Sequence, residues 1–332
     1  MNTATRKWAL LLSLLGLLVQ PSAMQSAMAQ TANKTTDVTI ELPSGKKVFY
    51  RDSGGKGIPV VFLHAGSGNS MLWEKQIPSF TSAGYRFIAI DYRGVDDGGA
   101  GAPPGGNTSG DLINELVTKL GLSKFHLVGT AAGGGAALQY AMANRDKLRS
   151  ITIANSIGNV QDKTYTEMGN RIRPAAFNQL PLEMRELGPS YRAVNPEGVE
   201  RWLALSGKNE SGPPNDAKKG SPKERGNDQG AGGPGGPTTA GKPPSGNNAD
   251  NGSGKGDNNP NAVTWANLEK FNVPTLLLTG DADLYTPPSV LRLFVEHMKQ
   301  AEYAIITESG HSAYWENPDD FNRTVLAFIS KY

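Results

Sequence analysis

The stretch that decides the fold is Leu127-Val128-Gly129-Thr130-Ala131-Ala132-Gly133-Gly134. An apolar run, Phe125–Gly129, leads into it, and a helix-like segment, Gly133–Ala143, leads out of it. Glycine stands on both sides of its centre, as a sharp turn requires, because larger side chains would clash with the neighbouring strand and helix. The stretch therefore predicts a tight connection from a strand directly into a helix, with Ala131 at its tip.

Apolar runs of strand length alternate with helix-like segments along most of the chain. Val60-Val61-Phe62-Leu63, for example, is apolar throughout, as in strands that are covered on both faces of a parallel sheet. The predicted strands are Val38–Leu42, Lys47–Tyr50, Pro59–His64, Phe87–Asp91, Phe125–Gly129, Ser150–Asn155, Pro274–Gly280 and Tyr303–Thr307. The predicted helices are Trp73–Ala83, Ser109–Leu120, Gly133–Ala143, Pro287–Met298 and Pro318–Ile329. This order predicts an α/β fold, with a mostly parallel eight-stranded sheet flanked by helices.

Residues 1–29 have the features of a secretory signal peptide. Arg6 and Lys7 form a basic start, Trp8–Val19 is apolar, and Ala27-Met28-Ala29 is a small-residue cleavage site. The alternative is an uncleaved anchor, but the apolar run is short for crossing a bilayer. The sequence thus predicts an exported protein, periplasmic or secreted, that makes no membrane contact after cleavage.

The segment 206–261 differs in composition from the rest of the chain. It contains no Val, Ile, Leu, Met or aromatic residue and consists mostly of Gly, Pro, Asn, Ser, Lys and Asp. Such a segment buries too little apolar surface to offset the entropy of ordering it, so we expect a disordered insertion. About 250 residues of globular composition remain, enough for one α/β domain. Its core would comprise residues 30–155 and 262–332.

Charge and residue usage exclude several classes of function. The chain has 33 basic and 31 acidic residues, and removal of the signal peptide takes away two basic ones, which leaves a formal charge of zero. This balance gives no electrostatic basis for binding nucleic acid. The absence of cysteine excludes thiolate catalysis and thiolate metal sites, and four histidines without ligand spacing predict no metal site. We expect a small-molecule substrate and no cofactor.

Five landmarks in order resemble those of the α/β-hydrolase fold superfamily, in particular its esterases and lactonases. They are Phe62-Leu63-His64-Ala65-Gly66-Ser67-Gly68, Ile90-Asp91-Tyr92-Arg93-Gly94, the stretch around Ala131, Leu278-Thr279-Gly280-Asp281-Ala282-Asp283 and Ser309-Gly310-His311-Ser312. Besides the stretch around Ala131, two landmarks depart from the family pattern: Ala65 replaces the usual glycine, and Val95-Asp96-Asp97 replaces a small-residue continuation.

The resemblance assigns roles to particular residues. His311 matches the family's base and Asp283 its acid, with Asp281 as the second candidate acid. Gly66 and Ala132 match the backbone donors of the oxyanion hole, and Gly129 and Gly133 the glycines of the nucleophile elbow Gly-x-Ser-x-Gly. In this register Ala131 occupies the nucleophile position.

A methyl group cannot attack a carbonyl, so Ala131 excludes the usual acyl-enzyme route. Ser67, Thr130 and Ser156 are the candidates for a displaced nucleophile, although local hydrogen bonding explains each of them as well. Residues 156–205 lie where family members insert a helical cap. Within them we expect helices at Thr164–Ile172, Leu182–Leu187 and Glu197–Leu205. The candidates for an apolar ceiling or cap core are Met168, Phe177, Leu180, Leu182, Met184, Tyr191 and Trp202.

Three hypotheses for function remain open at this stage. The first is a hydrolase of a small ester, lactone or related carbonyl compound, in which His311 activates water directly. The second is a cofactor-free proton-transfer or lyase-type enzyme that uses the same pair. The third is a catalytically silent binding protein that keeps the pocket. The sequence predicts no oligomeric state.

Overall fold

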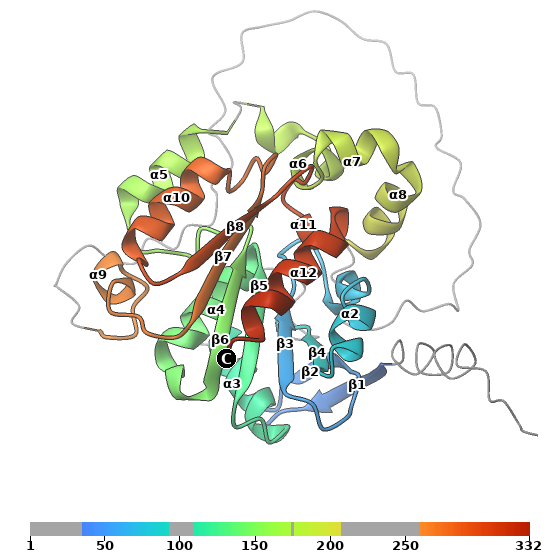
Figure 1. The fold of residues 1–332 in the computed structure, drawn as a ribbon, viewed down its shortest axis with the longest axis vertical. Coiled ribbons are helices and arrows are strands. Elements are labelled where there is room, and N and C mark those ends of the chain that lie inside the picture. The colour runs from blue at the N-terminus through green and yellow to red at the C-terminus, as the bar shows by residue number, and fades with distance from the viewer. Residues whose placement is uncertain (1–34, 93–108, 174–175, 207–258) are drawn as a thin grey trace, which may run out of the picture. The chain divides into compact units, whose positions relative to one another are not determined.

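A computed structural model describes residues 35–92, 109–173, 176–206 and 259–332 (Figure 1). The predictions for residues 1–29, and nearly all of those for 206–261, concern parts of the chain outside these ranges. All eight predicted strands are present: β1 (Thr36–Glu41), β2 (Lys47–Asp52), β3 (Pro59–Leu63), β4 (Arg86–Ile90), β5 (Phe125–Thr130), β6 (Leu148–Ala154), β7 (Thr275–Gly280) and β8 (Glu302–Ile306).

The strands form one sheet in the order β1-β2-β4-β3-β5-β6-β7-β8. β1 pairs antiparallel with β2, and β2 antiparallel with β4, while every other pairing is parallel. The predicted mostly parallel eight-stranded sheet is therefore confirmed. Because β5, β6, β7 and β8 run in the same direction, their carboxyl ends lie along the same edge.

Helices cover both faces of the sheet because its central strands are apolar on both sides. Val61 and Leu63 of β3 belong to one core, and Val60 and Phe62 to the other. The first core contains buried residues of α3 (Ser109–Lys119), α4 (Ala132–Ala143) and α10 (Pro288–His297). The second contains residues of η1 (Ser70–Trp73), α2 (Ile77–Ser82), α8 (Pro196–Leu205), α11 (Ala313–Glu316) and α12 (Pro318–Ile329).

The prediction of one helix over Trp73–Ala83 is wrong. The structure has the 3-10 turn η1, which the Asn69 side chain caps by accepting the Met71 N–H, and then the separate helix α2. Pro78 explains the break, because it has no N–H to continue a helix and is tolerated in the first turn of α2.

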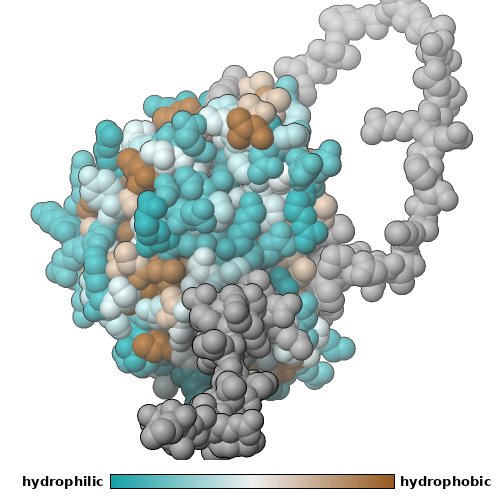
Figure 2. Space-filling model, turned by 45° about the vertical axis from the view of Figure 1, so that its right-hand side comes forward, coloured by the Kyte–Doolittle hydropathy of each residue, from teal (hydrophilic) through white to brown (hydrophobic). Residues whose placement is uncertain are grey.

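In the segment predicted as a cap, the described residues form four α-helices and one 3-10 turn: α5 (Lys163–Arg171), η3 (Phe177–Gln179), α6 (Leu182–Glu186), α7 (Pro189–Val194) and α8. The sequence patterns missed α7, and also α9 (Trp265–Leu268) and α11, each of which is six residues or shorter. The face shown in Figure 2 is mostly hydrophilic, and its apolar residues are scattered rather than gathered in one patch. In the part of the chain that the structure describes, no helix is long and apolar enough to span a bilayer.

Candidate active site

Ala131 occupies the turn between β5 and α4, in a backbone conformation that residues other than glycine rarely adopt. Its φ is 51° and its ψ is −118°. The Ala131 N–H donates to the Ala154 carbonyl at 2.9 Å, which ties the turn to β6.

Gly129 and Gly133 flank this turn where backbone segments lie very close together. A Cβ at Gly129 would overlap the Gly133 carbonyl, and one at Gly133 would overlap the Leu63 carbonyl. The strand and helix approach each other so closely only because these two positions are glycine.

His311 and Asp283 are hydrogen-bonded and buried. His311 follows β8, Asp283 follows β7, and Nδ1 of the histidine lies 2.9 Å from each carboxylate oxygen. The side chains are 7% and 0% exposed. A carboxylate at Nδ1 keeps the proton there, so Nε2 is left as the basic nitrogen. The structure thus brings together the two residues that the sequence singled out as base and acid.

Backbone and side-chain donors hold the Asp283 carboxylate in one orientation. It accepts the N–H of Tyr285 at 2.7 Å and that of Thr286 at 3.0 Å. The Asn155 amide donates to it at 3.0 Å and to the Gly310 carbonyl at 3.1 Å. Asn155 follows β6 with a φ of 50°, which aims its side chain between the acid and the histidine loop.

The pKa shifts of the pair follow from mutual stabilisation inside the protein. Burial disfavours the charged imidazolium, but the Asp283 carboxylate outweighs burial, so the pKa of His311 is raised above 6.5. Burial alone would raise the pKa of Asp283, yet His311 and the donors around the carboxylate lower it below 3.8.

His311 opens into a pocket of about 250 Å³. The pocket brings together the predicted positions Gly66, Ala131, Ala132 and His311 with residues from the segment between β6 and β7. Its lining is Ala65, Gly66, Ser67, Ala131, Ala132, Asn155, Ser156, Ile157, Asn159, Arg173, Glu186, Tyr285, Thr286 and His311. Ala132 is the first residue of α4, so its N–H has no partner within the helix and is positioned as anion donors at helix starts are.

Several other candidates occupy different places. Among the described residues Asp281 forms no hydrogen bond with His311: its carboxylate accepts the N–H groups of Glu308 and Ser309, both at 3.1 Å, and the acid hydrogen-bonded to His311 is Asp283. Thr130 is completely buried, away from the pocket lining. Ser67 and Ser156 do line the pocket, and the Ser156 hydroxyl accepts the Gly158 N–H at 3.1 Å.

Sequence patterns missed six polar residues of the pocket: Asn155, Asn159, Arg173, Glu186, Tyr285 and Thr286. The Tyr285 ring packs against the His311 ring with centroids 4.3 Å apart. Glu186 ends α6 and is 6% exposed. The sequence could have indicated Asn155 as a site residue, because it lies at the end of a predicted strand. Nothing in Leu182-Glu183-Met184-Arg185-Glu186 indicates that Glu186, rather than Glu183, belongs to the site.

The Glu316 carboxylate joins the histidine loop to the segment after α6. It accepts the N–H of Gly188 at 2.6 Å, that of Gly310 at 2.9 Å and that of Ser312 at 3.2 Å. Burial raises its pKa to about 7, although these donors favour the charged form. The Glu316 carboxylate therefore fixes the backbone on both sides of His311, because it binds the N–H groups of Gly310 and Ser312.

The sequence model of the family described as alpha/beta hydrolase fold matches residues 58–318. The chain belongs to this family. A 2-hydroxy-6-oxononadienedioate/2-hydroxy-6-oxononatrienedioate hydrolase of Paraburkholderia xenovorans is 22% identical over 328 residues, which cover 92% of this chain and 100% of that protein.

Solved structures support the same fold. An esterase from Thermogutta terrifontis superposes with a TM-score of 0.60 at 19% identity, covering 89% of this chain and 98% of its own. An enol-lactonase from Burkholderia xenovorans superposes with a TM-score of 0.60 at 16% identity, covering 88% and 100%. In this chain, which has the α/β-hydrolase fold, the turn between β5 and α4 carries the methyl group of Ala131.

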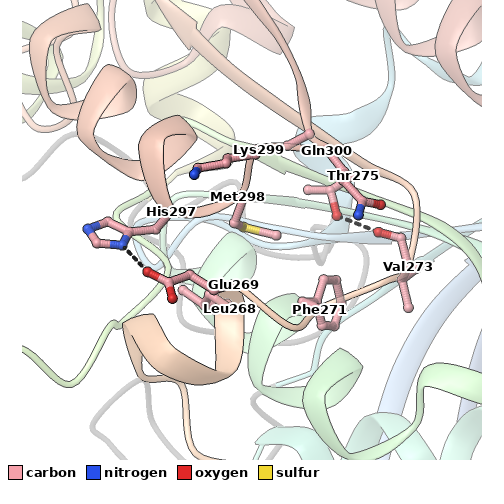
Figure 3. A pocket seen from close by; sticks show the side chains of 10 residues that line it. Leu268, Glu269, Phe271, Val273, Thr275, His297, Met298, Lys299 and Gln300 are labelled. Carbon is pink, nitrogen blue, oxygen red and sulfur yellow. Dashed lines mark hydrogen bonds and ion pairs between the residues drawn. The ribbon is translucent and has the colours of Figure 1, made fainter.

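A second pocket, of about 300 Å³, lies by the start of β7 (Figure 3). It contains another histidine–carboxylate pair, His297 and Glu269, with Nδ1 and Oε1 3.1 Å apart. Among the described residues no group of three or more His, Cys, Asp or Glu side chains is placed to hold a metal ion.

Proposed function

We propose that the chain is a hydrolase of a small ester, lactone or related carbonyl compound, in which His311 activates water without a covalent enzyme intermediate. The observation that carries this proposal is the buried His311–Asp283 pair, whose histidine lines a pocket that Ala131 also lines. The pair supplies a base, and the methyl group of Ala131 leaves space for water where the family has a hydroxyl.

The reaction would proceed in two steps. His311 Nε2 takes a proton from water, and the water oxygen attacks the carbonyl carbon to form an oxyanion that the N–H groups of Gly66 and Ala132 would stabilise. The oxyanion then collapses to the acid, the departing oxygen takes up one proton and leaves as the alcohol, and His311 gives up the proton that it accepted. Asp283 stabilises the imidazolium during the reaction and fixes the ring orientation.

The named activities of the relatives support a carbonyl substrate. They comprise a hydrolase of oxononadienedioates, an esterase and an enol-lactonase. The volume of about 250 Å³ supports a small substrate, because ligand pockets usually span about 300–1,000 Å³.

Ala131 also favours a second candidate, a proton-transfer or lyase-type reaction. Abstraction of a proton next to a carbonyl needs a base and an oxyanion hole but no hydroxyl at position 131. A substrate that exchanges its α-hydrogen with deuterated solvent, without hydrolysis, would support this candidate over the first.

The test uses p-nitrophenyl acetate, ethyl acetate and γ-butyrolactone. We expect turnover that depends on His311, no pre-steady-state burst, and no acyl adduct in the mass of acid-quenched protein. An adduct on Ser67 or Ser156 would contradict direct attack by water, and rates unchanged in His311→Ala would contradict the whole proposal.

A further inference from the structure

Glu186 is a buried carboxyl in the pocket that the mechanism above does not use. It is the last residue of α6, which lies near the carboxyl end of β8 in Figure 1. Its side chain lines the same pocket as Ala131 and His311. An acidic group is rarely buried to this extent without a partner or a function.

The backbone around Glu186 is tied to the backbone around His311. The Glu186 carbonyl accepts the Ser312 N–H at 3.0 Å. Two residues further on, Gly188 donates to the Glu316 carboxylate, which also accepts the Gly310 N–H. These bonds fix Glu186 relative to His311 independently of its own side chain.

The Glu186 side chain has hydrogen-bonding capacity that the described residues leave unused. Its buried Oε2 accepts no hydrogen bond from them. The Ser67 hydroxyl lies beside the carboxyl and favours its charged form, but without regular hydrogen-bond geometry. Burial raises the pKa of Glu186, the nearby Asp283 carboxylate raises it further, and His311 opposes both. A raised pKa lets this carboxyl keep its proton to a higher pH than an exposed glutamate does, and it can donate that proton into the pocket.

We propose that Glu186 is the proton donor of this site and protonates the leaving oxygen of an unactivated ester or lactone. This proposal rests on the proposed function, since it needs a hydrolytic step to act on. It also narrows the substrate class, because a dedicated donor matters most when the leaving group is an alkoxide, a poor leaving group in water.

The protons balance in this scheme. His311 takes one proton from the attacking water, whose oxygen forms the new bond to the carbonyl carbon. Collapse of the tetrahedral intermediate breaks the bond to the alcohol oxygen, which receives the Glu186 proton. Transfer of the proton from His311 back to Glu186, directly or through solvent, restores both groups and leaves one acid and one alcohol.

The test compares Glu186→Gln with Glu183→Gln, a carboxyl of the same helix that does not line the pocket. Glutamine keeps the shape of glutamate but transfers no proton. We expect kcat/KM for ethyl acetate to fall about a hundredfold or more in Glu186→Gln. For p-nitrophenyl acetate, whose leaving group needs no proton, we expect a fall of less than about threefold. Glu183→Gln should resemble the unmodified protein with both esters.

Equal losses on the two esters would overturn the role of Glu186 and leave the proposed function standing. An unmodified protein that hydrolyses neither ester nor γ-butyrolactone would overturn the proposed function and this proposal together. If Glu186→Gln does not fold, a series of acetate esters tests the unmodified protein. A shallow dependence of kcat/KM on the leaving-group pKa supports proton donation, and a steep dependence contradicts it.

The pH profile is a further readout that a purely structural role would not change. The charged or titratable groups facing Glu186 are Arg185, Asp283, Tyr285, His311 and Tyr314, and Arg173 lines the same pocket. With ethyl acetate, the rate of the unmodified protein should fall at high pH as Glu186 loses its proton. Glu186→Gln should lack this fall, and a fall that persists in the variant would contradict the proposal.

Discussion

Strand β7 has a histidine–carboxylate pair near each end, and the two pairs differ in nearly every other physical respect. Beyond its carboxyl end, His311 and Asp283 are 7% and 0% exposed. By its amino end, His297 and Glu269 are 35% and 58% exposed. The first carboxylate accepts two backbone N–H groups and the Asn155 amide besides the histidine. The outer imidazole stacks on Trp265 with centroids 4.1 Å apart.

The difference shows that a pocket with a histidine and an acid is not enough to make a reactive site. The pocket by the start of β7 is the larger of the two, yet its histidine and carboxylate are joined by one side-chain contact, drawn as a dashed line in Figure 3. At the carboxyl ends of the parallel strands, several loops converge and their hydrogen bonds hold the charged side chains in place. Because these side chains are buried, solvent does not screen their charges. The predictions below test this contrast.

The largest expected effect is the difference in activity between two variants, each of which lacks one of the two histidines. We expect His311→Ala to lower kcat/KM for any true substrate by about a hundredfold or more, since a positioned general base contributes at least this much. His297→Ala should leave it within about twofold, since a solvated surface pair adds little. Comparable losses in the two variants, measured on matched preparations, would refute the distinction between the pairs.

The pH dependence follows from the raised pKa of His311. A base must be neutral to act, so the rate with p-nitrophenyl acetate, whose leaving group needs no proton, should rise with pH and reach its plateau only above 6.5, the ordinary value for imidazole. An ascending limb centred below 6.5 would contradict stabilisation of the imidazolium by Asp283.

Ala131→Ser tests whether the inner pocket has the geometry of a nucleophile elbow. The substitution adds one oxygen on a backbone that already adopts the strained turn, so its structural cost should be small. We expect stoichiometric labelling by a fluorophosphonate at residue 131 and a burst with p-nitrophenyl acetate. Thr130→Ser is the control, because Thr130 is completely buried. Folded Ala131→Ser protein without labelling would show that position 131 is not aimed at His311.

The sequence predicted the pair and the turn but not the groups around them. His311, Asp283 and Ala131 follow the parallel strands β8, β7 and β5 of one sheet, so their order along the chain was enough to bring them to one edge. Glu186 joins them through the long-range bonds of Ser312 and Gly188, which no local pattern encodes. The break at Pro78 could have been predicted from its missing N–H.

Glu316 should make stability depend on pH in a way that exposed carboxyls do not. Burial raises its folded pKa from 4.5 to about 7. An acid whose pKa is higher in the folded protein than in the unfolded one stabilises the fold at pH values below its unfolded pKa. This stabilisation is lost as the pH rises through the folded pKa. Relative to Glu316→Gln, the unmodified protein should therefore lose about 3 kcal/mol of unfolding free energy between pH 4.5 and 7. Urea denaturation at several pH values measures this, and a pH-independent difference would contradict it.

The smallest expected effect is the coupling free energy between His297 and Glu269. It is the reference value with which the buried pair, His311 and Asp283, can be compared. Solvent screens both side chains, and ordering them costs conformational entropy, so exposed pairs typically contribute about 0.2–1 kcal/mol. A double-mutant cycle with His297→Ala and Glu269→Gln should give a coupling energy in this range that falls further at high salt. His297→Ala also removes the stacking on Trp265, but the cycle cancels that loss because both arms contain it. A coupling above about 2 kcal/mol, insensitive to salt, would mean that the outer pair is as well shielded as the inner one. Burial would then no longer explain why the chemistry is placed at the carboxyl end of β7.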